Sequence, residues 1–218
     1  MRVARVWAAC RVLTCWHAPL LDMARLHSAV VLALALSSLL TEIAADCDVV
    51  SKKQWDGLIP VHVSYLARPV SLVIVQHTVT PFCRTDAGCE ELVRNIQTNH
   101  MEALQYWDIG PSFLVGGNGK VYEGSGWLHV GAHTYGYNSR SIGVAFIGNF
   151  NTDEPSGAML EALRSLLRCG VERGHLAGDY RVVAHRQLIA SESPGRKLYN
   201  QIRRWPEWLE NVDSIKNA

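Results

Sequence analysis

The stretch SLVIVQHTV, residues 71–79, decides the fold of this chain. It is a continuous aliphatic run that ends in three polar residues, Gln76, His77 and Thr78. Such a run is typical of a strand that is buried on both faces, in a sheet covered by helices. Ligand pockets in α/β proteins open at strand ends and in the loops beyond them. We therefore expect a central strand whose polar end borders a site.

The sequence on either side of this strand alternates between helical and extended patterns. Pro155 and Ser156 precede one helical stretch, which Gly170 or Gly174 ends, and Pro206 stops another. The expected elements are a helix over 89–104, a hairpin over 112–124 around Asn118-Gly119, a strand over 141–150, a helix from 157, a strand over 180–185 and a helix over 195–208. This order predicts an α/β domain with a central mixed β-sheet flanked by about three helices.

The N-terminal region has the three parts of a secretory signal. Arg25 precedes the apolar run AVVLALALSSLL at 29–40, and small residues follow it up to Ala45. We predict a signal peptide over residues 1–45, with Met23 as a possible true start, and one domain over 46–218. The apolar run is shorter than the roughly 20 residues of a membrane span, although an N-terminal anchor helix is the alternative.

Charge excludes some classes of partner. The chain has 21 Lys and Arg against 20 Asp and Glu, and no basic tail or patch stands out. Binding to nucleic acid relies on clustered positive charge, as does binding to an anionic membrane surface. We therefore expect no nucleic-acid partner and no membrane span.

Cleavage at Ala45 would leave four of the six cysteines: Cys47, Cys83, Cys89 and Cys169. An even number in a secreted domain indicates two disulfides, with three possible pairings. Cys83–Cys89 would close a short local loop and is the simplest choice, which pairs Cys47 with Cys169. The lack of CxxC spacing argues against a cysteine zinc site.

Four histidines stand near expected strand ends or in the regions around them. His77 follows the first strand, His100 lies on the first helix, His133 lies in the loop GAHTYGYN, and His185 ends the last strand. Any one of them alone is more often structural. Together they indicate the lining of a cleft.

Four longer motifs carry a family resemblance: QHTVTPFC, DIGPSFLVGGNGKVYEGSGW, GAHTYGYNSRSIGVAFIGNF and SPGRKLYNQIRRWPEW. Together they resemble the peptidoglycan recognition proteins, which have the fold of bacterial and phage type-2 amidases. The resemblance runs from about Cys47 to Trp208 and is closest to the short secreted insect members, including those of the Toll pathway. It matches both disulfides, Cys83–Cys89 and Cys47–Cys169.

The resemblance also locates a degenerate zinc site. Catalytic members hold zinc with two histidines and one cysteine, and these positions are Gln76, His185 and Ser193 here. The catalytic tyrosine of the family matches Pro111. A catalytic zinc needs about three protein ligands, and neither an amide nor a serine hydroxyl replaces imidazole or thiolate well. We therefore expect no metal, no cofactor and no amidase activity.

Three rival functions remain open at this point. The chain could be an N-acetylmuramoyl-L-alanine amidase that holds zinc with atypical ligands. Ser193 and His185 could form a serine-type peptidase, although no orienting acid or oxyanion hole is evident. Alternatively, the groove could be vestigial in a protein with a structural role.

The expected ligand is bacterial peptidoglycan, bound through its muramyl peptide. The resemblance and the aromatic and polar character of these side chains indicate a ligand-binding set. The set is His77, Thr78, His100, Trp107, His133, Tyr135, Asn138 and His185.

Arg140 gives a weak preference for lysine-type peptidoglycan. Members that prefer diaminopimelate carry an arginine one residue earlier, where this chain has Ser139. Adjacent residues on a strand point to opposite faces, so Arg140 would face away from the ligand. By the same resemblance we expect a secreted, extracellular protein that engages downstream immune signalling proteins.

Overall fold

The structure is a computed structural model that describes residues 47–216. The predicted signal peptide lies outside the described residues. Both expected disulfides are present: the Cα atoms are 5.6 Å apart in Cys47–Cys169 and 5.0 Å apart in Cys83–Cys89. The prediction from cysteine spacing is therefore confirmed.

A mixed six-stranded sheet forms the centre of the described residues, in the order β1-β4-β3-β5-β2-β6. Only the β3–β4 pair is antiparallel in this sheet. Its strands are β1 Val49–Val50, β2 Val70–His77, β3 Phe113–Val115, β4 Val121–Glu123, β5 Ile142–Phe146 and β6 Leu176–Ala184. The stretch that opened the sequence analysis is thus β2, which pairs in parallel with β5 and β6.

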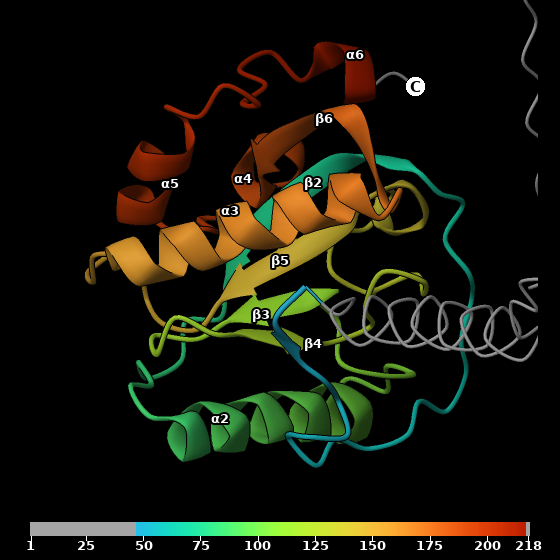
Figure 1. The fold of residues 1–218 in the computed structure, drawn as a ribbon, viewed down its shortest axis with the longest axis vertical. Coiled ribbons are helices and arrows are strands. Elements are labelled where there is room, and N and C mark those ends of the chain that lie inside the picture. Colours follow the sequence, from blue (N-terminus) through green and yellow to red (C-terminus); the bar gives the residue numbers. More distant parts are fainter. Residues whose placement is uncertain (1–46, 217–218) are drawn as a thin grey trace, which may run out of the picture. The chain divides into compact units, whose positions relative to one another are not determined.

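Helices cover both faces of this sheet (Figure 1). They are α2 Asp86–Thr98, the π-helix η1 Asn99–Ala103, the 3₁₀-helix η2 Asn138–Arg140, α3 Gly157–Glu172, α4 His185–Leu188, α5 Arg196–Ile202 and α6 Asp213–Lys216. The central mixed sheet with flanking helices confirms the predicted fold class. No helix within 47–216 is long and apolar enough to cross a membrane.

Three local expectations were wrong. The helix expected from residue 195 up to Pro206 ends at Ile202, and residues 207–209 pair with Val182 of β6. The hairpin turn is not a two-residue Asn-Gly turn. Gly119 alone takes a positive φ of 79°, within a longer loop. Arg140 lies in a 3₁₀ turn rather than in a strand.

The two faces of the sheet pack against different helices. Val73 and Val75 of β2 face α3 and α5, in one core with Leu163 and Ile202. On the opposite face, α2 covers the β3–β4 side, and α4 with residues 209–215 covers β2 and β6. In Figure 1, α3 crosses in front of the strands and α2 lies below them.

Small residues in β5 leave space on this face of the sheet, between the part that α2 covers and the part that α4 covers. Ile142, Val144 and Phe146 point into the α3 core, so Gly143 and Ala145 lie on the other face. A Cβ on Gly143 would lie 2.3 Å from the ring of His133, so only glycine admits that ring. The alternation of β5 therefore places its small residues where a groove opens.

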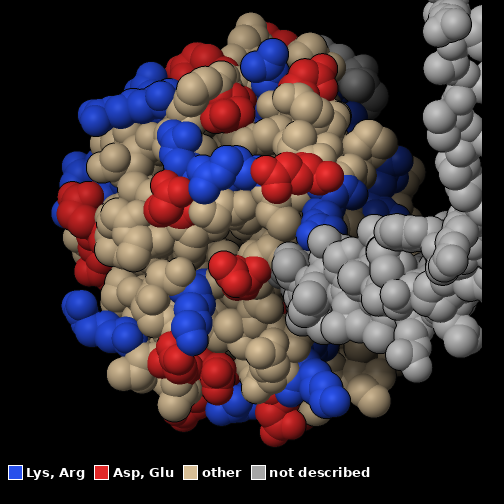
Figure 2. All heavy atoms as spheres, in the orientation of Figure 1, with Lys and Arg blue, Asp and Glu red and all other residues tan. Residues whose placement is uncertain are grey.

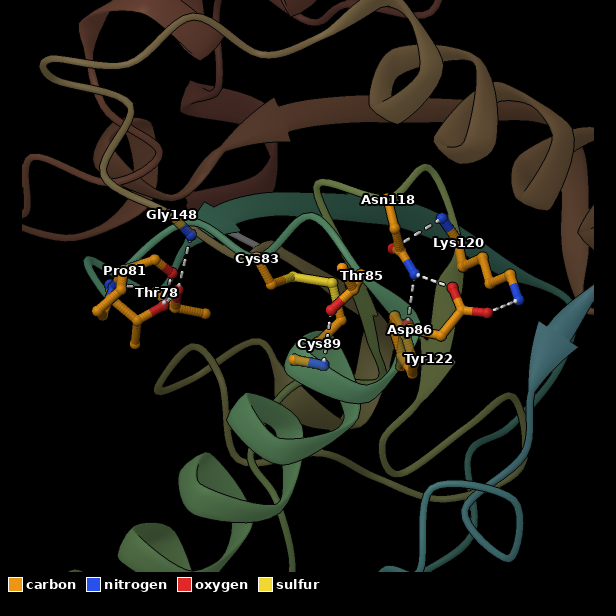
Figure 3. The surroundings of a disulfide bond; sticks show 12 residues. Thr78, Pro81, Cys83, Thr85, Asp86, Cys89, Asn118, Lys120, Tyr122 and Gly148 are labelled. Atoms are coloured by element: carbon orange, nitrogen blue, oxygen red, sulfur yellow. Dashed lines mark hydrogen bonds and ion pairs between the residues drawn. A yellow bond between two sulfur atoms is a disulfide. The ribbon is translucent and has the colours of Figure 1, made fainter.

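A network around the Cys83–Cys89 disulfide holds the start of α2 (Figure 3). We call this network the stapled corner: the disulfide with Thr85, Asp86, Asn118, Lys120 and Tyr122. Thr85 Oγ1 caps α2 by accepting from Gly88 N–H. Asn118 Nδ2 donates to Asp86 (2.9 Å) and to the Tyr122 hydroxyl (2.8 Å), and Lys120 pairs with Asp86 (2.7 Å). The corner fixes the wall of the groove that α2 provides.

Charges on the surface are mixed. Figure 2 shows Lys and Arg side chains interspersed with Asp and Glu over the face that it draws. That face therefore offers no extended field of one sign for a polyanion.

Candidate functional site

A groove of about 680 Å³ opens at the end of β2. Its floor is the sheet at Gln76 and Ala145, one wall is α2 with η1, and the other wall is the segment 191–193 after α4. A volume of this size is typical of a site for a ligand of several rings or residues. Glu192 is the single Asp, Glu, Lys or Arg residue in its lining.

Gln76 has its amide nitrogen turned into the protein. Nε2 donates to the carbonyl oxygen of His133 (2.6 Å) and lies 3.4 Å from Thr134 Oγ1. Its side chain follows Leu72 and Ile74 on the same face of β2, which packs against α4. This amide therefore ties β2 to the loop that carries His133.

Ser193 is fixed by backbone contacts at the same end of the groove. Its Oγ accepts from His77 N–H (3.0 Å), and its own N–H donates to Ser191 Oγ (3.0 Å). Within residues 47–216, Ser193 Oγ makes no hydrogen bond to His185. The serine hydroxyl is thus held by β2 rather than by an imidazole.

His133 and His185 line the groove, and each has one ring nitrogen without a hydrogen-bond partner in residues 47–216. His133 Nε2 and His185 Nδ1 are buried and have no hydrogen-bond partner. Burial, together with the neighbouring His185, lowers the pKa of His133 to about 3. Burial also lowers the pKa of His185. Both rings are therefore neutral at pH 7, and each can accept or donate one hydrogen bond to a ligand.

His77 and His100 flank this pair and are oriented by backbone donors. His77 Nδ1 accepts from Phe150 N–H (3.2 Å), and His100 Nδ1 accepts from Gly110 N–H (2.9 Å). Each is therefore a tautomer with the proton on Nε2. Burial lowers the pKa of both rings. The groove thus holds four neutral imidazoles.

The structure brings together most of the predicted site. His77, Thr78, His100, His133 and His185 line one groove with Gln76, Ser193 and Pro111. The remaining three residues of the predicted set do not line it. Tyr135 is 91% exposed, Trp107 lies in a neighbouring pocket, and Asn138 Oδ1 accepts from His133 N–H and Thr134 N–H. Asn138 therefore shapes the loop, and contact between these three residues and ligand stays a prediction.

Sequence reasoning missed the face that α2 and η1 turn toward the groove. Leu92, Asn95, Ile96 and Asn99 follow one another at helical spacing and line the wall. The π-turn from Asn99, closed by Leu104 N–H on its carbonyl, then places His100 beside Tyr106. The amphipathic pattern contained this signal, because Asn95 and Asn99 lie one turn apart between apolar residues.

Comparison with known proteins gives consistent results. The family model described as N-acetylmuramoyl-L-alanine amidase matches residues 66–198, which include the groove from Gln76 to Ser193. A peptidoglycan recognition protein of Trichoplusia ni is 68% identical over 169 residues, which are 78% of this chain and 93% of that protein.

Solved structures of the same kind match the fold. Peptidoglycan recognition protein-1 of Manduca sexta has 59% sequence identity and a TM-score of 0.76, covering 78% of this chain and 98% of that one. Peptidoglycan recognition protein-LE, solved in complex with tracheal cytotoxin, a monomeric diaminopimelic acid-type peptidoglycan, has 40% identity and a TM-score of 0.73, covering 74% and 96%.

Proposed function

This chain belongs to the peptidoglycan recognition protein family and has the type-2 amidase fold, and on that premise we propose that it binds bacterial peptidoglycan in its groove without zinc amidase activity. The ligand is the muramyl peptide. Its amides and hydroxyls supply the hydrogen-bond partners that His133 Nε2 and His185 Nδ1 lack. The complex of protein-LE with a peptidoglycan fragment supports this choice of ligand.

One observation carries the proposal: two of the three positions of the family's zinc site hold an amide and a serine hydroxyl, and each of these groups has a hydrogen bond inside the protein. Gln76 donates its amide to the His133 carbonyl, and Ser193 Oγ accepts from His77 N–H. His185 is then the single imidazole of the three, whereas catalytic zinc takes about three protein ligands. Among residues 47–216, no group of three or more His, Cys, Asp or Glu side chains is arranged to hold a metal. The residues present do not fit zinc.

The contacts of Ser193 also disfavour a serine-type peptidase. A nucleophilic serine needs a base within hydrogen-bond reach, and that base needs an orienting group. Ser193 Oγ instead meets a backbone N–H, and His185 Nδ1 has no orienting partner. We therefore assign binding rather than hydrolysis to this end of the groove.

Arg140 supports a preference for lysine-type stem peptides. Its Nη2 donates to the carbonyl of Ile215 (2.9 Å), and its guanidinium lies 4.8 Å from the centre of the Tyr137 ring. The side chain is thus committed to the C-terminal segment. The groove lining contains no Lys or Arg, so the extra carboxylate of diaminopimelate finds no cation there.

Co-sedimentation with insoluble peptidoglycan tests the binding proposal. We expect the wild-type protein to pellet with the lysine-type polymer more than with the diaminopimelate-type polymer. Asn95→Trp fills the groove from the α2 wall and should weaken pelleting at least tenfold. Glu91→Trp adds the same ring to an exposed α2 position outside the groove and should pellet like wild type. A vestigial groove would give no pelleting of the wild-type protein.

Turnover of purified muramyl peptide tests the absence of catalysis. We expect no release of free stem peptide, with or without a chelator. Release that stops with chelator would establish an amidase with atypical ligands, and release that persists in chelator but stops in Ser193→Ala would establish a serine-type peptidase.

Secretion and signalling complete the proposal. We infer that residues 1–45 are removed and that the extracellular protein, once bound to peptidoglycan, engages downstream immune signalling proteins. The apolar run at 29–40 and the two disulfides support an oxidising, extracellular setting. Sequencing the N-terminus of protein secreted by insect cells tests the cleavage, with Asp46 as the expected first residue.

A further inference from the structure

The loop between β3 and β4 contains Asn118-Gly119, the single Asn-Gly dipeptide of the sequence. A glycine has no Cβ beside its nitrogen, so this nitrogen can approach the preceding side chain more freely than that of any other residue. Attack of the Gly119 nitrogen on the side-chain carbonyl carbon of Asn118 closes a five-membered succinimide. Asn118 is therefore a position of the stapled corner that can change covalently without an enzyme.

The fold requires glycine at this reactive position. Gly119 has a φ of 79°, in the left-handed region that favours glycine. A Cβ there would lie 3.1 Å from the Cβ of Ala158 in α3, which is a tight contact. The turn and its packing against α3 thus disfavour the larger residues that would slow ring closure. The reactive dipeptide is a consequence of how this loop meets α3.

Hydrogen bonds engage both reacting groups while the corner is closed. Asn118 Nδ2 donates to Asp86 (2.9 Å) and to the Tyr122 hydroxyl (2.8 Å), as Figure 3 shows. Gly119 N–H donates to the carbonyl oxygen of Gly116 (3.0 Å). Ring closure removes the proton from the Gly119 nitrogen and expels Nδ2, so it breaks all three hydrogen bonds. The closed corner therefore opposes the reaction.

The corner lies at the surface, so it can open without unfolding of the whole domain. The side chains of Asp86 and Lys120 are 58% and 49% exposed, and Asn118 and Gly119 are partly buried. Exposed clusters of this kind open locally at a lower free energy than the core. Each opening frees the amide of Asn118 and the nitrogen of Gly119 together, and it admits water.

The reaction needs only water as a co-reactant. Hydroxide takes the proton from the Gly119 nitrogen, the bond from this nitrogen to Cγ of Asn118 forms, and the Cγ–Nδ2 bond breaks. Nδ2 takes a proton from water and leaves as ammonia. Water then adds to one of the two succinimide carbonyls. Opening at Cγ gives aspartate, and opening at the backbone carbonyl gives isoaspartate.

Either product disturbs the corner. Aspartate places a carboxylate oxygen where Nδ2 of Asn118 now lies 2.9 Å from Asp86, and like charges at such a distance repel each other. Isoaspartate lengthens the backbone by one carbon in a loop that packs closely on Ala158. Asp86 is in the first turn of α2, so both products act on the start of that helix.

We propose that Asn118 is a site of spontaneous deamidation, that the closed corner restrains the reaction, and that the products weaken the attachment of α2. Because α2 forms one wall of the groove, the modification loosens that wall. The conversion is irreversible, so the converted fraction records how long the corner has been open during the life of the molecule. The reaction does not depend on peptidoglycan binding.

Peptide mass spectrometry of the folded protein tests the site. Trypsin releases residues 95–120 as one peptide, in which Asn95 and Asn99 are internal controls because larger residues follow them. Digestion in H₂¹⁸O labels any conversion that occurs during handling. At pH 7.5, Asn118 should convert faster than either control. In reduced, urea-unfolded protein its conversion should be at least about tenfold faster than in the folded protein, because the corner is then always open.

Asp86→Ala tests the restraint, because it removes one of the two bonds that Asn118 Nδ2 donates. Conversion in the folded variant should be about fivefold faster than in wild type, as expected for one net hydrogen bond. Tyr122→Phe removes the other bond and should act in the same direction. Glu91→Ala is the matched control, because it removes an exposed carboxylate of α2 that does not contact Asn118. Its conversion rate should stay within about twofold of wild type.

Asn118→Asp reproduces the aspartate product and tests its effect on the corner. At pH 7.5 this variant should melt below wild type. Added salt should narrow the difference, because salt screens the repulsion from Asp86.

Three results would overturn the proposal: equal conversion rates in folded and unfolded protein, wild-type rates in both Asp86→Ala and Tyr122→Phe, or an Asn118→Asp variant as stable as wild type. None of these results bears on the pelleting of unmodified protein with peptidoglycan, so the proposed function is tested separately.

Discussion

The groove and the stapled corner are both polar clusters beside α2, but they differ in how their polar atoms are satisfied. In the corner, Asn118 donates to two partners and Lys120 pairs with Asp86 (Figure 3). In the groove, His133 Nε2 and His185 Nδ1 are buried without a partner. Folding gives every polar group named in the first cluster a partner, whereas it leaves two ring nitrogens of the second without one. This difference is why we assign a structural role to the corner and propose ligand binding for the groove.

Acidification should lower the stability of the folded protein through the groove rather than through the corner, because the groove holds its imidazoles neutral. The folded-state pKa of His133 is about 3, well below the value of about 6.5 in an unfolded chain. The unfolded state therefore binds more protons between these values, and stability is lost as the pH falls through that window. From pH 7.5 to pH 5, His133 alone should lower the free energy of unfolding by about 2 kcal/mol. Urea denaturation at each pH measures this.

His133→Gln is the matched variant for the acid effect. It should be less stable at pH 7.5 but should show a shallower dependence of the unfolding free energy on pH, because a titrating group is gone. An unchanged slope would mean that His133 is not held neutral by burial.

Removal of the corner disulfide tests the other half of the comparison. Cys83→Ser with Cys89→Ser opens a short loop, and the chain-entropy model gives a loss of about 2 kcal/mol in unfolding free energy. Unlike the acid effect, this loss should be the same at pH 7.5 and pH 5, because no titrating group is involved. A loss that grows at low pH would show that the corner and the groove are coupled.

Two asparagines give the sharpest pairwise contrast. Asn118→Ala removes bonds to Asp86 and Tyr122 and should cost about 1 kcal/mol of stability with little effect on ligand affinity. Asn95 lines the groove, so Asn95→Ala should leave stability unchanged and weaken muramyl peptide binding about fivefold. Thermal melts measure the stability of both variants, and calorimetry measures their affinity for muramyl peptide. If both variants lost stability and affinity to the same extent, the contrast between corner and groove would be wrong.

The smallest effect is expected for the exposed ion pair of the corner. Lys120 and Asp86 have about half of their side-chain surface in solvent, and exposed pairs contribute little. Lys120→Met should change the melting temperature by less than about 2 °C. A larger drop would show that the pair orders the start of α2.

Much of this architecture was predictable from local patterns. The strand β2 could be predicted from its aliphatic run, and the start of α3 could be predicted from Ser156. Burial of a strand leaves a run of apolar residues in the sequence, and capping places a serine just before a helix. The end of α5 at Ile202 was not readable, because residues 207–209 pair with β6 through tertiary contacts.

The candidate site was predictable in part, by resemblance rather than by pattern. Motif matching located Gln76, His185 and Ser193, and the structure places all three in one groove. It did not show that Gln76 and Ser193 use their polar atoms internally, because such contacts depend on side-chain direction. The same limit explains why Trp107 was expected in the groove but lines a neighbouring cavity.

Zinc content tests the central claim most directly. Elemental analysis of natively purified protein should find far less than one zinc per molecule. Gln76→His with Ser193→Cys, which supplies the missing imidazole and thiolate beside His185, should gain up to one zinc per molecule. One tightly bound zinc per wild-type molecule would contradict the account, because the groove would then hold a metal with the residues that we assign to binding.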